Sequence, residues 1–400
     1  MSKIRDHQST QPAIRFKGFT DAWGERNLGE IFNYEQPTKY IVKSTEYDDN
    51  FNTPVLTAGK SFLLGYTDEI SGIKNATVEN PVVIFDDFTT GSHYVDFPFK
   101  IKSSAMKLLS LNDNSDNFYF MFNTLKNIKY VPQSHERHWI SKFSSFEIYK
   151  PSQEEQQKIG SFFKQLDATI ALHQRKLAKL KELKQGYLQK LFPRNGSKFP
   201  QLRFAGFADA WVQRNLADLS DGFSYGLNAA AKEYDGVHGY LRITDIDEVS
   251  HSFLPEGLTS PDVPEDQLTD YRMDEQSIVY ARTGASTGKT YIYRDSDGEL
   301  YYAGFLIRQK VNKETSAQFV YQNTLTKAWE RYVQVMSQRS GQPGINAQEV
   351  GRFELAIPEK AEQDKIAHLF NSLDNLIAAT QRKGEVLKNL KKALLQKMFV

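Results

Sequence analysis

One glycine-rich stretch has the composition of a phosphate-binding loop. Gly284-Ala285-Ser286-Thr287-Gly288-Lys289-Thr290 resembles a Walker A loop, but three residues separate its glycines where that loop has four. The next residues, Tyr291-Ile292-Tyr293, follow a strand pattern, whereas a Walker A loop opens a helix. We therefore predict a β-turn with Arg282 and Lys289 at its base and no nucleotide site.

Other residues that could support catalysis do not form a known constellation. His135, Glu136 and His138 have the spacing of an exposed loop and no third metal ligand near them, which favours a solvated or phosphate-facing cluster over a metal site. The chain has no cysteine, and this excludes disulfides and thiolate chemistry. It also lacks an adenine-methyltransferase loop, a nuclease carboxylate–lysine set and helicase motifs. We expect a protein without catalytic, metal or cofactor residues of its own.

The elements that must position any functional residue are repeated within the chain. The string from Ile14 to Trp23 returns as Leu202 to Trp211, at an offset of 188. The stretch from Pro151 to Phe192 returns as Pro358 to Phe399, at an offset of 207, and half of its 42 positions are identical. Two long inserts that do not visibly resemble each other separate these copies. Such a pair of units suggests pseudo-twofold symmetry, although a plain tandem duplication is the simpler alternative.

The second repeat predicts two long helices with a coiled-coil seam. Apolar residues in the first copy step by four and three, and only His173 and Lys184 interrupt them. Ser152 and Glu155 have the spacing of a capping box, and Pro193 follows the end of the helix. The seam residues are Ile159, Phe163, Leu166, Ile170, Leu177, Leu180, Tyr187 and Leu191, and in the second copy Ile366, Phe370, Leu373, Ile377, Leu387, Leu394 and Met398.

The partner that suits each seam best is the other copy. About 40 helical residues make a rod of roughly 60 Å, too long to bury its seam in one globular domain. We therefore predict that the two helices pair antiparallel within the chain. Their basic side chains then form either a solvated surface or a strip that follows a phosphate backbone. These residues are Lys176, Lys179, Lys181, Lys184, Arg382, Lys383, Lys388, Lys391 and Lys392.

The inserts are predicted to be mixed α/β domains. Short apolar runs at 81–85, 277–281 and 304–308 have the length of strands, and 118–126 and 317–335 have helical patterns. The fold class is thus α/β (α+β), with two globular domains in a pseudo-twofold arrangement, separated by the two long helices. The predicted domains are 1–147, a helix at 148–192, a linker and second globular domain at 193–354, and a helix at 355–400.

Charge and hydropathy limit the cellular context. The net charge is only +1, yet the two repeated helices together carry +7 and the rest carries −6. Composition alone therefore does not indicate DNA binding. The N-terminus lacks the apolar run of a signal peptide and no segment has transmembrane length, so we expect a cytoplasmic protein without membrane contact.

Taken together, the repeat order, the Arg-Phe-x-Gly-Phe-x-Asp-Ala-Trp strings, the Pro-x-x-x-Glu-Gln-x-Lys-Ile helix openings and the Arg282-Thr283-Gly284 turn resemble the DNA-specificity subunits of type I restriction-modification systems. The resemblance covers essentially the whole chain. It implies that each insert reads one half of a split, asymmetric DNA site and that the helices set the unread spacer. It also implies docking of two adenine-methyltransferase subunits, which use S-adenosylmethionine, and of restriction subunits that use ATP and Mg²⁺.

The base-reading side chains in such a protein would be arginine, lysine, asparagine and glutamine on exposed loops. In the first insert the exit of the central strand reads Asp86-Asp87 and departs from the Arg-Thr-Gly pattern, so we expect these carboxylates to hold a lysine or accept from cytosine. Trp23 and Trp211 are assigned to packing. The candidate DNA contacts are Lys60, His93, Tyr94, Arg137, His138 and Trp139 in the first insert, and Tyr280, Arg282, Thr283, Ser286, Lys289, Gln342 and Asn346 in the second.

Two other functions stay open at this point. A coiled-coil scaffold whose inserts bind proteins would have no salt-dependent affinity for DNA, whereas a DNA-recognition subunit would lose affinity steeply as salt rises. A nucleotide-dependent enzyme built on the Gly284 loop would bind ATP in equilibrium dialysis.

Overall fold

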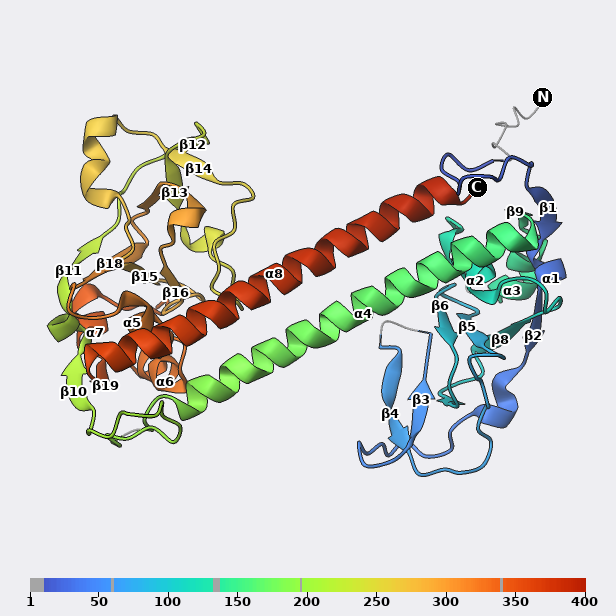
Figure 1. Ribbon diagram of the computed structural model, residues 1–400, viewed down its shortest axis with the longest axis horizontal. Coiled ribbons are helices and arrows are strands. Elements are labelled where there is room, and N and C mark those ends of the chain that lie inside the picture. Colours follow the sequence, from blue (N-terminus) through green and yellow to red (C-terminus); the bar gives the residue numbers. More distant parts are fainter. Residues whose placement is uncertain (1–10, 59–60, 132–136, 195, 339–340) are drawn as a thin grey trace. The chain divides into compact units, whose positions relative to one another are not determined.

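The computed structural model describes residues 11–58, 61–131, 137–194, 196–338 and 341–400. The chain divides into two compact units (Figure 1). Unit 1 comprises Met1–Arg175 and Gln381–Val400, and unit 2 comprises Lys176–Thr380. Each unit thus holds one insert together with parts of both long helices.

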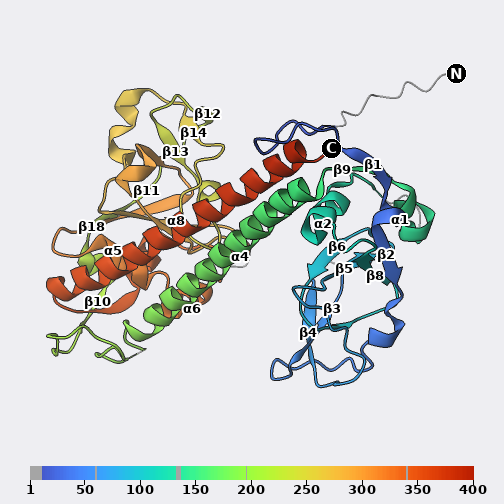
Figure 2. The ribbon, with the colours of Figure 1, turned by 45° about the vertical axis from the view of Figure 1, so that its right-hand side comes forward.

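Unit 1 contains most of the first half of the chain. Its central sheet has the strand order β2-β8-β5-β6, and smaller sheets have the orders β4-β3-β7 and β1-β9. Both views place α2 between the central sheet and the beginning of α4 (Figures 1 and 2). The elements are β1 (Gly24–Asn27), α1 (Leu28–Ile31), β2 (Phe32–Glu35), β3 (Thr53–Leu56), β4 (Leu63–Thr67), β5 (Val82–Asp86), β6 (Ser92–Val95), β7 (Lys100–Ile101), β8 (Met106–Leu111), α2 (Phe118–Asn127), α3 (His138–Ser141), β9 (Glu147–Lys150) and the first part of α4 (Gln153–Lys190).

Unit 2 repeats this plan. Its central sheet has the order β11-β18-β15-β16, so in both units the first strand lies next to the last and the two middle strands follow. Pairs β12-β14, β13-β17 and β10-β19 complete it. The elements are β10 (Val212–Asn215), β11 (Ser220–Tyr225), β12 (Ala231–Glu233), β13 (Gly239–Leu241), β14 (Thr259–Pro261), β15 (Ser277–Ala281), β16 (Thr290–Ile292), β17 (Leu300–Tyr302), β18 (Leu306–Val311), α5 (Ala317–Asn323), α6 (Lys327–Met336), α7 (Ala347–Gly351), β19 (Glu354–Ile357) and the first part of α8 (Lys360–Met398).

The short apolar runs form the central strands, as predicted. β5 and β15 are buried almost throughout, because each is an unbroken apolar run between two neighbouring strands. The helical pattern at 317–335 is interrupted and gives α5 and α6. The break falls at Thr324, whose hydroxyl donates to the carbonyl of Tyr321 at 2.7 Å and lies 2.8 Å from the hydroxyl of Thr290.

The start of each long helix is fixed by its Glu-Gln pair. The Glu155 N–H does donate to the Ser152 hydroxyl at 3.4 Å, but the Glu155 carboxylate binds Arg15 at 2.6 Å, so only half of the predicted capping box forms. Glu362 binds Arg203 in the same way at 2.7 Å. Both glutamates are buried, and each ion pair ties the first repeated string to a helix start.

The glutamines that follow cap a different helix. Gln156 donates to the carbonyl of Pro151 and accepts from the N–H of Asn117, the residue that precedes α2, both at 3.0 Å. Gln363 makes the equivalent bonds to Pro358 and to Ser316, which precedes α5, again at 3.0 Å. The repeated helix openings therefore hold each insert to its helix.

Each unit also receives the end of the helix that begins in the other unit. The N–H of Ile14 donates to Lys397 in α8, and the N–H of Leu202 donates to Lys190 in α4, both at 2.9 Å. Both tryptophans of the first repeated string are buried, as predicted, and pack against a phenylalanine of the insert helix, with neighbouring ring centroids 5.2–5.8 Å apart. The rings are Trp23, Phe120 and Phe399 in unit 1, and Trp211, Phe319 and Phe192 in unit 2.

The helices pair antiparallel inside each unit, as predicted. In unit 1 Phe163 contacts Phe399 and Asp167 binds Lys391, so positions later in α4 meet earlier positions in α8. Unit 2 repeats the pattern with Lys184 bound to Asp374 and Phe192 stacked on Phe370. None of the helices in the described ranges is both long and apolar enough to cross a lipid bilayer.

Candidate nucleic-acid interface

The loop after β15 is a turn, as the sequence predicts, and it pairs with a segment far along the chain. Thr283 and Gly344 form an antiparallel bridge, and the Gly284 N–H donates to the carbonyl of Pro343 at 3.0 Å. At Gly288 the backbone φ is +84°, and a β-carbon would lie 2.5 Å from Val333. The turn leads directly into β16, and the helix that a Walker A loop requires is absent from this described segment.

Arg282 is the basic side chain that this turn presents. Its guanidinium lies 4.8 Å from the ring centroid of Tyr225, and the side chain is half-buried. The Tyr225 hydroxyl accepts from the N–H of Ala347 at 3.3 Å, and Gln342, the residue before Pro343, is exposed. We call Tyr225, Arg282, Thr283 and Gln342 the turn surface. A planar cation and an amide on an exposed loop can form the paired hydrogen bonds that base edges offer.

Asn346 lies next to the turn surface but has a local role. Its side-chain oxygen accepts from the N–H of Glu349, and the Glu349 carboxylate accepts from the N–H of Asn346, both at 2.9 Å. This reciprocal capping box starts α7. The side chain is exposed, and the cap uses only its oxygen, so its NH2 group can still donate to a ligand.

Lys289 and Ser286 hold a neighbouring loop in place. The buried Lys289 ammonium donates to the carbonyls of Ile243 at 2.9 Å and Ile246 at 2.8 Å, and to the carboxylate of Glu248 at 2.6 Å. The Ser286 hydroxyl donates to the same carboxylate at 2.9 Å. The hydrogen bond from Lys289 lowers the pKa of Glu248. Lys289 is therefore a structural cation, and its burial removes it from the turn surface.

Tyr280 is likewise part of the core. Its side chain is fully buried, its hydroxyl donates to Gln309 at 2.5 Å, and its ring packs on Trp329 with centroids 5.3 Å apart. Burial raises the pKa of this phenol. A contact between Tyr280 and a base would require the sheet to open, so the assignment to DNA contact is corrected to packing.

Two candidates of the first insert are buried in the same manner. The backbone N–H of Trp139 donates to the carboxylate of Asp87 at 2.9 Å, and His138 Nδ1 lies 3.3 Å from the hydroxyl of Tyr130. Both side chains are buried, and we assign them to the core in place of DNA contact. Asp87 also pairs with buried Lys107 at 3.3 Å, which confirms that this carboxylate holds a lysine.

The remaining candidates of unit 1 do not gather into one surface. His93 stacks on Phe62 with ring centroids 4.4 Å apart, and Tyr94, its neighbour in β6, packs on Tyr119 at 5.0 Å. Burial raises the pKa of Tyr94 to about 12. Arg137 is exposed at the start of α3. Lys60 lies outside the described residues, as do His135 and Glu136.

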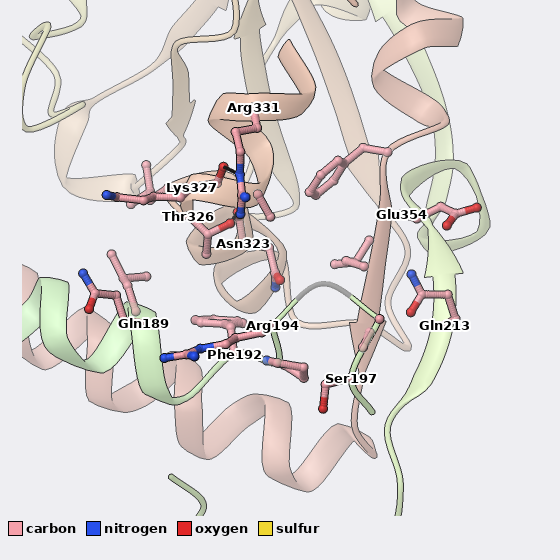
Figure 3. Close-up of a pocket in the computed structure, with 18 of the residues that line it drawn as sticks. Gln189, Phe192, Arg194, Ser197, Gln213, Asn323, Thr326, Lys327, Arg331 and Glu354 are labelled. Carbon is pink, nitrogen blue, oxygen red and sulfur yellow. Dashed lines mark hydrogen bonds between the residues drawn. The ribbon is translucent and has the colours of Figure 1, made fainter. Parts of the chain in front are cut away.

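The sequence did not identify a basic pocket beside the end of α4. This pocket, of about 570 Å³, is lined by Arg194, Lys327 and Arg331 together with one carboxylate, Glu354. Figure 3 shows Gln189 from α4, Arg194 from the following segment, and Lys327 and Arg331 from α6 around it. Among the described residues none of the three cations forms an ion pair. Lys327 and Arg331 are four residues apart in α6, so the sequence could have placed these two on one helix face. Only the tertiary structure brings Arg194 beside them.

The helix lysines divide into two classes. Lys184 and Lys391 bind carboxylates of the opposite helix, so neither belongs to the solvated surface or basic strip predicted from the sequence. The other seven basic residues predicted for the strip are exposed. In the described ranges no group of three His, Asp or Glu side chains is placed to bind a metal.

Comparison with known proteins agrees with this arrangement. The model of the type I restriction modification DNA specificity domain matches residues 20–182 and 238–389. The chain is 30% identical over 374 residues to the type I restriction enzyme EcoR124I/EcoR124II specificity subunit of Escherichia coli, which covers 87% of this chain and 86% of that protein. It is 22% identical over 205 residues to the putative type I restriction enzyme MjaX specificity subunit of Methanocaldococcus jannaschii, covering 50% and 48%.

A crystal structure of the type I restriction-modification system S subunit from M. genitalium has the same fold. The TM-score is 0.71 at 14% sequence identity, over 98% of this chain and 99% of that one. The family match spans both halves of the chain, including most of both inserts and of both long helices, and the Escherichia coli relative aligns over 86% of its length. The chain therefore belongs to the family of type I restriction-modification DNA-specificity subunits.

Proposed function

We propose that this chain reads a bipartite, asymmetric DNA site, one half with each unit, and supplies no catalysis itself. The observation that carries the proposal is one repeated scaffold beneath two different surfaces. The central sheets have the same strand order, yet the exit of β15 presents Arg282 and Thr283 where the exit of β5 presents Asp86 and buried Asp87. Identical frames with different reading surfaces suit two unrelated half-sites.

The repeated frame also suits two copies of one partner. The ion pairs Arg15–Glu155 and Arg203–Glu362 and the aromatic contacts recur in both units, so each unit offers an equivalent foundation for the same protein. We propose two adenine-methyltransferase subunits as these partners, with S-adenosylmethionine bound to them. Restriction subunits that use ATP and Mg²⁺ would join the complex, which would act in the cytoplasm. The paired helices would set the spacer between the half-sites.

An exchange of one insert tests this function. Residues 212–354 are replaced by the corresponding insert of another specificity subunit, and methylated adenines are mapped in cells that also produce the modification partner. We expect one half-site to change while the other half-site and the spacer stay the same. A change in both halves contradicts independent reading. If both methylated half-sites stay the same after the exchange, unit 2 does not recognise DNA.

The protein-binding scaffold makes a different prediction for purified components. It predicts that the complex binds DNA no more tightly at 50 mM salt than at 200 mM salt, whereas a reader that neutralises several phosphates loses orders of magnitude in affinity over this range. A fluorescence-anisotropy titration at the two salt concentrations separates them.

A further inference from the structure

Each helix seam contains one lysine at the same place in the repeat. In unit 1 the Lys391 ammonium lies 2.6 and 2.7 Å from the two carboxylate oxygens of Asp167. In unit 2 the Lys184 ammonium lies 2.6 Å from the carboxylate of Asp374. The offset of 207 relates lysine to lysine and aspartate to aspartate. The same interhelical ion pair is therefore built twice.

A third group from the insert completes each pair. The Tyr119 hydroxyl, on α2, donates to Asp167 at 2.5 Å, and the Gln322 amide, on α5, donates to Asp374 at 3.2 Å. The Arg294 guanidinium also lies near this carboxylate, 3.9 Å from an oxygen of Asp374. Each aspartate thus joins its own helix, the opposite helix and the insert of its unit. The donors differ between the units, while the aspartate and lysine are retained.

Burial makes these pairs sensitive to register. Between 11% and 28% of each of the four charged side chains is exposed, so a lysine or aspartate without its partner would be left largely out of water. Apolar seam residues recur every three or four positions and can meet other apolar residues after a slip of one heptad. The ion pairs cannot, because the positions seven residues before and after each of the four charged residues hold no charged side chain.

We propose that Asp167–Lys391 and Lys184–Asp374 fix the register of the two helices and thereby the spacer length that the protein accepts. The inference rests on the proposed function, because it concerns the distance between the two half-sites. All four side chains are positioning residues and do not contact DNA. A polar pair within an apolar seam is a known means of selecting one register at some cost in stability.

Charge reversal tests the register role in the complete complex with its modification partner. Asp167→Lys, Lys391→Asp and the exchanged double variant are titrated against DNA duplexes whose half-sites are separated by the native spacer or by one base pair more or fewer. We expect either single reversal to lower the preference for the native spacer by about tenfold, as for loss of a charged hydrogen bond. The exchanged pair should restore most of it. Lys388→Asp, on the exposed side of the same helix, is the matched control and should leave the preference unchanged.

An apolar double variant separates register from stability. Asp167→Leu combined with Lys391→Leu continues the apolar seam, so the thermal unfolding temperature should be retained while the spacer preference falls. A full native preference in this variant, or in either single reversal, overturns the proposal. The proposal is also overturned if a single reversal weakens DNA binding equally for all three spacers and the exchanged double variant does not restore it. If the native complex itself does not distinguish its half-sites from random DNA, the proposed function fails instead.

Discussion

Arg282 and Lys289 carry the same charge at the base of the same turn, yet they have opposite surroundings. The Lys289 ammonium donates three hydrogen bonds within unit 2, to two carbonyls and one carboxylate. The Arg282 side chain is half-buried, and its guanidinium, which carries five N–H donors, lies 4.8 Å from the centre of the Tyr225 ring. A ring beneath a guanidinium holds it in place while leaving its edge for a ligand. Of the two, Arg282 is the one we propose for DNA contact.

Replacing Arg282 by alanine tests this assignment. We expect DNA affinity to fall by about 1–3 kcal/mol and selectivity to relax at one base pair, because a paired contact to one base is lost. Binding is measured on duplexes that vary each position of one half-site. Arg308→Ala is the control, since Arg308 also lies over a tyrosine ring, at 5.0 Å, but belongs to the interior of β18. An equal loss of affinity on every duplex would indicate a phosphate contact.

Residue type alone could not sort the other candidates. His138, Trp139 and Tyr280 have side chains that are common in DNA interfaces, and all three are buried. Their burial depends on strands and loops that approach from elsewhere in the chain, such as the Asp87 loop beside Trp139. The repeated sequence does indicate one pair of contacts. Aspartate and lysine recur at fixed positions of both helices, and antiparallel pairing makes them partners.

At the level of elements, the spacing of apolar residues by three and four correctly predicts the two long helices and their antiparallel pairing. The seam residues step by three and four, and those of the repeated openings, such as Ile159 and Ile366, are buried in the units. The inserts are harder to compare by sequence. β5 and β15 share little more than apolar character, yet both occupy the same place in a four-stranded sheet. Sheet order depends on pairing between distant segments, which an apolar run does not encode.

The glycines of the long helices give a prediction at this scale. A β-carbon at Gly384 meets no atom within 4 Å, so Gly384→Ala should stabilise the chain by about 1 kcal/mol through helix propensity. At Gly160 a β-carbon would collide with Asn117, the residue that caps α2. Gly160→Ala should therefore destabilise unit 1. Urea unfolding followed by circular dichroism measures both changes, and equal effects of the two substitutions would contradict the packing described here.

For the whole molecule, the important feature is that sequence repeats and compact units do not coincide. Each unit takes its insert and the start of one helix from one half of the chain, and the end of the other helix from the other half. The Ile14–Lys397 and Leu202–Lys190 hydrogen bonds close the two units in the same way. Both helices therefore contribute residues to both units, which the proposed spacer role requires.

Lengthening both helices at this boundary tests the spacer role. Seven residues are inserted between Arg175 and Lys176 and seven between Thr380 and Gln381, which leaves the contacts within each unit intact. One heptad adds about 10 Å of helix. We expect the preferred spacer to grow by about three base pairs at roughly 3.4 Å each. Genome-wide mapping of methylated adenines reads the result, and an unchanged spacer would exclude the helices as the ruler.

The sequence by itself determined the duplication, the two helices with their antiparallel partnership, the central strands and the family, because these depend on local periodicity and on strings that recur. Only the tertiary structure decided which side chains reach the surface, that the unlike inserts share one sheet order, and that Lys184 and Lys391 are bound rather than free. These properties depend on contacts between segments far apart in the chain, and such contacts determine burial and hydrogen bonding.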